Sequence, residues 1–214
     1  MYINRGLPGA LRTKFDNVFN ENLFRGETSK SGNGSSLEQT YELSIALPWA
    51  ITNLEIKSIL DIPCGDLLWM STVDLSGVEY TGGDISPSLV RYLSSKYKNK
   101  QFKILDITKD TLPIVDLIFC RDLFVHLSNR DIKRAIENIK SSGCKYLATT
   151  SFSTRSENAD LPFITRGVAW RTINLEKKPF EFPAPFLTID EKCDEGDGKY
   201  ADKNIMFWEI TRLP

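Results

Sequence analysis

The sequence is of moderate length, nearly neutral in charge and ordinary in composition. Its 214 residues, 41% of them hydrophobic, suffice for one α/β domain with a full core. The 27 basic and 28 acidic residues leave a net charge of −1, so the chain lacks the overall basic character that nucleic acid or an anionic membrane attracts. No apolar run approaches the roughly 20 residues of a membrane span, and the first residues lack the apolar core of a signal peptide. We therefore expect a cytoplasmic protein.

The cysteines and the single histidine do not form a metal-binding pattern. Cys64, Cys120, Cys144 and Cys193 show no C-x-x-C spacing, and His126 is the only histidine. We therefore expect reduced thiols and no metal site.

The first 55 residues are predicted to form a helical cap in front of the main sheet. Residues 8–24 have the apolar spacing of a helix, and a polar, glycine-bearing loop follows over residues 28–36. Ser35 and Glu38 have capping-box spacing, which predicts a second helix directly after this loop. Pro48 should break or restart that helix.

From residue 58 the chain alternates between strands and helices. Ser86-Pro87 and Ser128 with Asp131 are helix-start signals, and Gly143 is a stop signal. This alternation, with buried apolar strands, predicts a Rossmann-like, doubly wound α/β fold, a three-layer sandwich with helices on both faces of a mainly parallel sheet. The predicted strands end at Asp61 and Asp84 and span 102–105, 115–120 and 146–152; a short helix is predicted over 67–73.

The pattern changes after residue 152. Residues 153–185 contain four prolines and little helical periodicity, and long loops of this kind are usually functional. We expect this segment to face the substrate. Strands follow at 186–189 and 205–211, and the lack of a helix between them indicates an antiparallel edge.

Two aspartates close two successive predicted strands. Asp61 ends the first strand and Asp84 ends the next, 23 residues (84 − 61) later. An acidic residue at the end of the second strand of such a fold is placed to accept hydrogen bonds from a ribose. Gly65 lets a ligand lie against the first turn, but the three-glycine dinucleotide fingerprint is missing. The pair therefore points to S-adenosylmethionine (SAM) before NAD.

The remaining strand ends offer further contacts to a nucleoside. Asp106 could accept a hydrogen bond from the adenine amino group, and Ile85 and Ile107 could sandwich its ring. The other cofactor-binding candidates on these turns are Asp61, Cys64, Gly65, Cys120 and Arg121.

The loop before the sheet could bind an anion. Ser31, Gly34 and Ser35 combine small residues and hydroxyls with the free N–H groups of a following helix. The carboxylate of SAM would fit there. A plain flexible connector is the alternative.

Two residues after the fourth strand could act as a base. His126 is well matched to take a proton from a hydroxyl near neutral pH, and Asp122 is the competing candidate. A purely structural histidine remains an alternative, because methyl transfer from a sulfonium depends largely on alignment and does not always need a base.

The segment after residue 152 supplies substrate-binding candidates. Arg166 and Arg171 could bind an anionic group, and Trp170 lies beside Arg171. The Asn/Asp-Pro-Pro-Tyr/Phe motif of amino-methylating nucleic-acid enzymes is absent after the fourth strand. A small-molecule or sugar hydroxyl is therefore favoured over nucleic acid.

Residues 58–152 resemble the class I SAM-dependent methyltransferases. Asp61-Ile62-Pro63-Cys64-Gly65-Asp66 stands at the glycine-rich motif of the family, Asp84 at its ribose acid and Asp106 at its adenine-side acid, although Pro63 replaces a common glycine. The resemblance implies a seven-stranded sheet whose last strand is antiparallel. Over nearly the whole chain, residues 31–40, 120–127, Trp170-Arg171 and Asn174-Leu175 are similar to a poorly characterised bacterial group of methyltransferases.

We therefore expect a single domain over residues 1–214 that methylates a small anionic or carbohydrate-type hydroxyl acceptor, without a membrane or nucleic-acid partner. A non-catalytic SAM-binding partner subunit and an aminopropyltransferase-like enzyme are the alternatives. The oligomeric state is left open.

Overall fold

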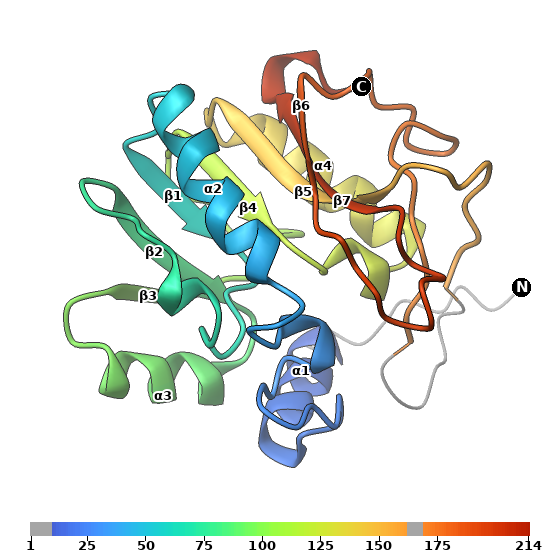
Figure 1. The fold of residues 1–214 in the computed structure, drawn as a ribbon. Coiled ribbons are helices and arrows are strands. Elements are labelled where there is room, and N and C mark those ends of the chain that lie inside the picture. Colours follow the sequence, from blue (N-terminus) through green and yellow to red (C-terminus); the bar gives the residue numbers. More distant parts are fainter. Residues whose placement is uncertain (1–9, 162–168) are drawn as a thin grey trace, which may run out of the picture.

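The computed structural model describes residues 10–161 and 169–214 and contains the predicted seven-stranded sheet (Figure 1). The strand order is β3-β2-β1-β4-β5-β7-β6, and β7 runs antiparallel to both of its neighbours. Both the fold class and the antiparallel last strand are confirmed. The strands are β1 (Ser58–Asp61), β2 (Glu79–Asp84), β3 (Gln101–Ile104), β4 (Leu117–Cys120), β5 (Tyr146–Phe152), β6 (Leu187–Asp190) and β7 (Lys203–Glu209).

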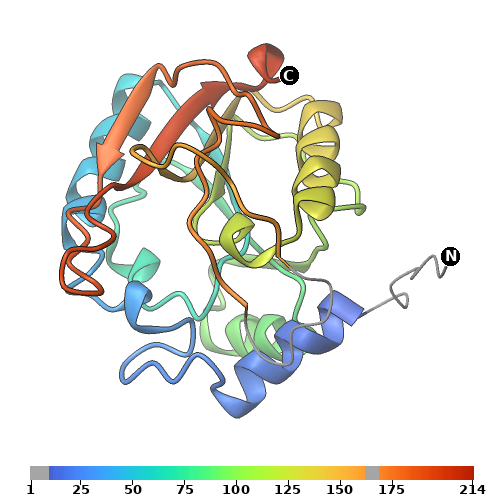
Figure 2. The same cartoon turned by 90° about the vertical axis from the view of Figure 1, so that its right-hand side faces the viewer.

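Helices cover both faces of this sheet, as Figure 2 shows with α2 and α4 on opposite sides. The apolar residues of α2 and α3 pack on one face in one core cluster, and those of α4 pack on the other face with the segment around residues 173–182. This is the expected three-layer arrangement. The helices are α1 (Ala10–Glu21), α2 (Tyr41–Asn53), α3 (Pro87–Lys96) and α4 (Asn129–Ser141).

Two of the three predicted helix starts are confirmed. The Ser86 hydroxyl accepts from the N–H of Leu89 at 3.2 Å, and the Ser128 hydroxyl accepts from the N–H of Asp131 at 3.1 Å. These bonds satisfy N–H groups that the first turn of a helix leaves free.

The predicted capping box is wrong. Ser35 belongs to a three-residue 3₁₀ helix (Asn33–Ser35), and α2 begins only at Tyr41. Pro48 lies inside α2 instead of breaking it, because the packing of Leu47 and Ala50 against the sheet outweighs the missing N–H. The predicted helix at 67–73 is likewise reduced to a 3₁₀ turn, Met70–Thr72.

The pairing of β5 with β7 brings distant residues to one edge of the sheet. Phe152, at the carboxyl end of β5, lies opposite Lys203, the first residue of β7. Glu191 directly follows β6, which runs parallel to β5, so it reaches the same edge. Residues from the last quarter of the chain therefore join the strand ends at which Asp61 and Asp84 lie.

Arg171 fastens the start of the segment after residue 168 to the turn between β4 and α4. Arg171 is 9% exposed, and its hydrogen bonds use all three nitrogens of the guanidinium. The strongest contacts run from Nε to the Ala159 carbonyl at 2.6 Å, from Nη1 to the Leu127 carbonyl at 2.8 Å and from Nη2 to Asn129 Oδ1 at 2.8 Å. Arginine serves here as a structural clamp.

We predict that Arg171→Ala lowers the free energy of unfolding by about 3 kcal/mol, because it leaves several buried carbonyls without donors. Arg171→Lys should lose less, since an ammonium retains three donors. Urea denaturation measures both changes. Arg134→Ala, at a 58% exposed side chain with one 3.5 Å ion pair, is the control and should change stability by less than about 0.5 kcal/mol. A loss no larger for Arg171→Ala than for the control would contradict the clamp.

Candidate functional site

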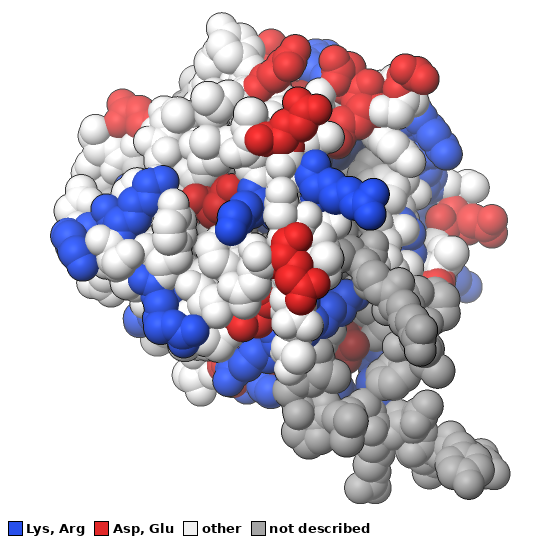
Figure 3. Space-filling model, turned by 90° about the horizontal axis from the view of Figure 1, so that it is seen from below, with Lys and Arg blue, Asp and Glu red and all other residues white. Residues whose placement is uncertain are grey.

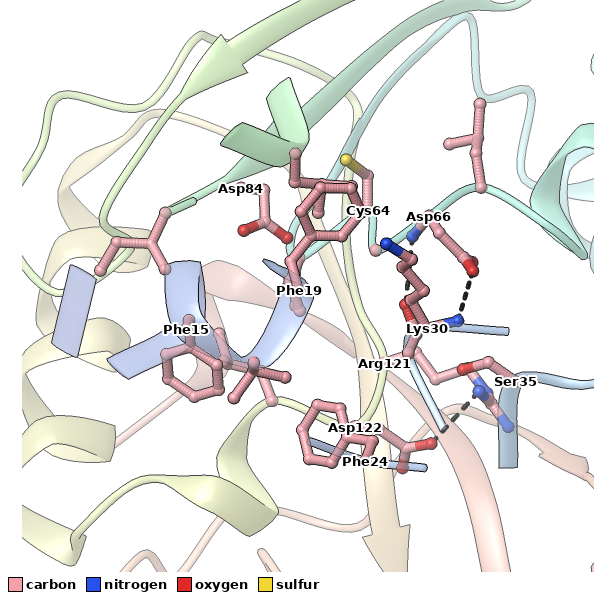
Figure 4. Close-up of a pocket in the computed structure, with 18 of the residues that line it drawn as sticks. Phe15, Phe19, Phe24, Lys30, Ser35, Cys64, Asp66, Asp84, Arg121 and Asp122 are labelled. Carbon is pink, nitrogen blue, oxygen red and sulfur yellow. Dashed lines mark hydrogen bonds and ion pairs between the residues drawn. The ribbon is translucent and has the colours of Figure 1, made fainter. Parts of the chain in front are cut away.

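A deep pocket lies at the carboxyl edge of the sheet, between β1, β2, β4 and the N-terminal helix. We call it the inner pocket; Figure 4 shows the side chains that line it. Asp84 faces it from the end of β2, and Arg121 and Asp122 face it from the end of β4. Residues from the N-terminal cap that line the inner pocket are Phe15, Val18, Phe19, Phe24, Lys30, Ser31 and Ser35.

Two buried carboxyl groups line the inner pocket. Asp84 is 6% exposed, and its Oδ1 accepts from the N–H of Ser86 at 2.8 Å. Asp61 is 3% exposed, and its Oδ2 accepts from the Tyr80 hydroxyl at 2.6 Å. Burial raises the pKa of Asp84 to about 6 and the pKa of Asp61 to about 7. Both groups therefore stand to gain from a ligand that donates hydrogen bonds or carries positive charge.

A smaller side pocket adjoins the inner pocket and shares Phe15, Pro63, Ile85 and Leu123 with it. Its walls are mostly apolar, and Ile85 and Ile107 both contribute to them. Asp106 is its only charged wall residue among those described; its Oδ1 accepts from the hydroxyl of Thr108 at 2.6 Å. The side pocket is therefore a mostly apolar cavity with one carboxylate in its wall.

The loop before the sheet is tied to the glycine turn instead of presenting a helix end. Gly65 has φ +54°, and a Cβ there would lie 2.4 Å from Ser31 Oγ, so its missing side chain makes room for Ser31. Asp66 accepts from the Ser29 hydroxyl at 3.0 Å and from the N–H of Lys30 at 2.7 Å. The sequence predicts that a ligand lies against Gly65. On the side where a Cβ would lie, Ser31 of the protein itself takes that place.

The N–H groups expected to receive an anion in this loop are partly used. Those of Ser35 and Ser36 donate to the carbonyls of Gly32 and Asn33 within the 3₁₀ turn. The helix N-terminus assumed from the sequence is absent at this point, because α2 begins at Tyr41. A cation is present instead: the exposed Lys30 lines the inner pocket, with its ammonium 4.6 Å from the centre of the Phe19 ring.

A second, more open hollow adjoins the inner pocket; we call it the outer pocket. Five residues line both pockets: Phe24, Ser31, Ser35, Asp122 and His126. Figure 3 views the molecule from the side of α1 and shows acidic and basic side chains mixed over the described surface. The other residues lining the outer pocket are Gly32, Asn33, Gly34, Phe152, Trp170, Glu195, Gly196, Tyr200 and Lys203.

His126 lies where the two pockets meet. Its Nδ1 is 2.8 Å from the Ala169 carbonyl, an acceptor only, so Nδ1 carries the proton and Nε2 has the lone pair. The rings of Phe15 and Phe24 pack against the imidazole. Burial lowers the pKa of His126 to about 4, so the ring is neutral at pH 7.

Asp122 belongs to a buried network of four charges. Lys203 Nζ lies 2.7 Å from Asp122 Oδ2, and Arg121 Nη1 lies 3.2 Å from the same oxygen. Arg121 also pairs with Glu191 at 2.5 Å, and Lys203 with Glu191 at 3.5 Å. Although burial opposes ionisation, Lys203 and Arg121 hold the pKa of Asp122 far below its ordinary value. Asp122 is therefore a fixed negative charge with little affinity for a proton.

Two candidates from the sequence do not fit their expected places. Cys120 was a cofactor-binding candidate, but it is 0% exposed and packs in the core on the α4 face, because strand alternation turns it away from the inner pocket. Arg171 was a substrate-binding candidate, but it lines neither pocket, and its donors are used on the backbone. Arg166 lies outside the described residues.

Several pocket residues were not predicted as site residues. Phe15 and Phe19 could have been suspected, because they lie on one face of the predicted N-terminal helix. Trp69, Lys30, Glu195, Tyr200 and Lys203 gave no local signal, since only the tertiary fold brings them to the pockets.

The described residues show no metal cluster and no membrane span. No three His, Cys, Asp or Glu side chains among them are placed to hold a metal ion. No helix within residues 10–161 and 169–214 is long and apolar enough to cross a membrane. All four cysteines are buried and unpaired.

Comparison with known proteins agrees with this geometry. A family model described as "Methyltransferase domain" matches residues 59–142, from β1 through α4. No curated protein sequence matches the chain.

Solved structures share the fold at low sequence identity. A Burkholderia thailandensis 1,6-didemethyltoxoflavin-N1-methyltransferase has a TM-score of 0.63 at 11% identity, over 98% of this chain and 91% of its own. The N-methyltransferase NodS from Bradyrhizobium japonicum WM9 has a TM-score of 0.56 at 14% identity, over 82% and 98%. Magnesium protoporphyrin IX methyltransferase from Synechocystis PCC 6803, with bound SAM, has a TM-score of 0.51 at 14% identity, over 75% and 83%. Residues 59–142, which contain the strands that build the inner pocket, thus match a methyltransferase domain, and the sheet has the fold of these SAM-dependent methyltransferases.

Proposed function

We propose that the protein transfers the methyl group of SAM to a hydroxyl oxygen of a small, carbohydrate-type acceptor. The cofactor occupies the inner and side pockets, and the acceptor occupies the outer pocket. The observation that carries this proposal is that the two pockets meet at His126 and Asp122, which line both. A methyl donor in one and a hydroxyl in the other would therefore face each other beside a neutral imidazole.

The residues of the inner and side pockets fit SAM. Asp84 supplies a buried acceptor for the ribose hydroxyls, and the side pocket, which Ile85 and Ile107 help to line, suits adenine, with Asp106 in its wall. Lys30 supplies a cation for the carboxylate of the methionine part, a role we had expected of Ser31, Gly34 and Ser35. Asp61, Cys64, Gly65 and Arg121 complete the wall. When bound, SAM supplies a methyl group already activated on a sulfonium.

His126 receives the proton of the acceptor. Because Nδ1 is held by the Ala169 carbonyl, Nε2 is the nitrogen available to a hydroxyl. A hydroxyl oxygen that gains a methyl group becomes a far stronger acid than an imidazolium, so even an imidazole whose pKa is lowered to about 4 takes its proton. Asp122 does not compete as the base, because Lys203 and Arg121 stabilise its ionised form and so lower its affinity for a proton. Its negative charge instead favours a cationic cofactor nearby.

The walls of the outer pocket suit a hydroxylated ring better than an anion. Trp170 and Tyr200 form an aromatic corner with ring centres 4.9 Å apart, and Phe152 packs edge-on against both. Glu195 and Asp122 offer acceptors for hydroxyl groups. The cation that lines this pocket, Lys203, is already paired with carboxylates, so among the described residues no unpaired cation is left for an anionic acceptor.

Turnover by the isolated chain is the direct test. The purified protein is incubated with SAM and a panel of monosaccharides and small phenols, and formation of S-adenosylhomocysteine is followed. We expect turnover with at least one hydroxylated acceptor and an O-methyl product by mass spectrometry. Tight SAM binding without transfer to any acceptor would favour a non-catalytic partner subunit. Aminopropyl transfer from decarboxylated SAM would favour an aminopropyltransferase-like enzyme.

We predict that Asp84→Asn weakens SAM binding by about ten- to a hundred-fold, because hydrogen bonds to a charged acceptor are worth roughly 1.5–3 kcal/mol. Isothermal titration calorimetry gives the dissociation constants. Asp74→Asn, at an exposed aspartate before the start of β2, is the matched control and should bind SAM as the wild type does. Equal affinities for Asp84→Asn and the control would remove Asp84 from the ribose site.

SAM affinity should also depend on pH through Asp84. The free carboxyl has a pKa raised to about 6, and ribose donors would stabilise its ionised form and lower the pKa in the complex. Binding is therefore at full strength above pH 6 and weakens by up to about tenfold per unit as the pH falls below 6. Calorimetry from pH 8 to pH 5 measures this dependence. Asp84→Asn should not show this loss of SAM affinity below pH 6. If both proteins depend on pH in the same way, Asp84 is not the ribose-binding residue.

We predict that His126→Asn lowers kcat by ~10²–10⁴ while SAM affinity stays within about twofold. The asparagine amide can retain the bond to Ala169 but offers no base in place of Nε2. Steady-state kinetics with a hydroxyl acceptor and saturating SAM measures kcat. A loss below about tenfold would favour methyl transfer by alignment alone.

A further inference from the structure

The outer face of α2 carries a row of exposed apolar side chains. Tyr41, Ile45 and Trp49 are four residues apart and are 60%, 57% and 58% exposed. Leu37, in the turn before α2, is 51% exposed. Residues spaced by four lie on one side of a helix, so the row is a continuous surface, which we call the α2 stripe.

The α2 stripe is not needed by the core or by the pockets. The opposite side of the helix already packs on the sheet through Leu43, Leu47, Ala50 and Ile51. Figures 1 and 2 show α2 on the outside of the molecule, with no described element over it. No residue of α2 lines the inner, side or outer pocket.

One more exposed aromatic side chain lies on the face of the sheet that α2 covers. Phe186, 42% exposed, packs against Tyr146 and Phe207 on the face that α2 covers. With the α2 stripe, it exposes roughly 450 Å² of apolar side chain. A standard interface buries about 800 Å² per partner, somewhat under 60% of it apolar, which is close to the same apolar area.

We infer that the α2 stripe binds the α2 stripe of a second copy of this chain, forming a two-fold dimer. Side chains at every fourth position form a ridge, and ridges of this kind pack into the grooves of an identical helix. A two-fold axis at Ile45 sets Tyr41 of each copy against Trp49 of the other, so the surface complements itself. The stripe contains no charged residue that such pairing would bury.

Two-fold pairing sets the two α2 helices antiparallel, so their dipoles attract each other. The N-terminal end of each stripe, with exposed Glu38 and Glu42, then lies toward the C-terminal end of the other, where the charges of exposed Glu55 and Lys57 balance. Both pockets stay open, since they lie at the carboxyl edge of the sheet.

Sedimentation equilibrium of the wild type and of Ile45→Glu tests this inference. We expect the wild type to reach twice the chain mass of 24.3 kDa and Ile45→Glu to sediment at the chain mass, with a dimer dissociation constant raised at least ~100-fold. Glutamate is a good helix former and position 45 is exposed, so the variant should fold. An unchanged thermal midpoint and unchanged SAM affinity check this.

Ile114→Glu is the matched control, because Ile114 is 79% exposed and lies between β3 and β4, away from α2. It should sediment as the wild type does. A monomeric wild type across the concentration range would overturn the inference. The inference would also be overturned if Ile45→Glu remained a dimer, or if Ile114→Glu weakened the dimer as much as Ile45→Glu does.

Discussion

Two cations and two carboxylates neutralise one another at the ends of β4, β6 and β7, and both pockets depend on this buried network. Arg121 and Lys203 are 6% and 5% exposed, and Glu191 is 2% exposed. Each of these charges alone would lose several kcal/mol of hydration, which only close pairing offsets. Because Arg121 and Asp122 come from β4 while Glu191 and Lys203 come from the β6–β7 hairpin, the pairing fixes that hairpin against the middle of the sheet. The hairpin in turn supplies one wall of the outer pocket.

The network also explains why Asp122 is charged while His126 is neutral. Asp122 has φ +56°, a left-handed conformation that turns the chain sharply after β4. The turn directs its carboxylate to Lys203 and leads into the 3₁₀ helix Phe124–His126. One group is thus kept ionised by cations, and the other is kept neutral by apolar burial. In the proposed reaction the first provides charge and the second receives a proton.

The sequence predicted what local pattern controls. Asp84 and Asp106 lie at strand ends because apolar runs followed by turn residues define those ends, and Ser86 and Ser128 cap helices because their hydroxyls precede the first turn. Arg171 was misjudged, because its sequence neighbours do not reveal that backbone carbonyls from residues 124–127 and 159 surround it. Lys203 and Glu191 were missed for a similar reason. Only the antiparallel register of β7 brings them beside Asp122.

The N-terminal cap and the glycine turn act as one structural unit. Ser31 fits against Gly65, and Asp66 binds Ser29 and the backbone of Lys30, so the loop that closes the inner pocket is held by the turn that begins it. The matched methyltransferase region, residues 59–142, therefore forms only part of the proposed cofactor site. The rest of that site comes from residues 15–35, and much of the outer pocket comes from residues 152–203. In the proposed reaction, most contacts to the acceptor would therefore come from segments outside the matched region.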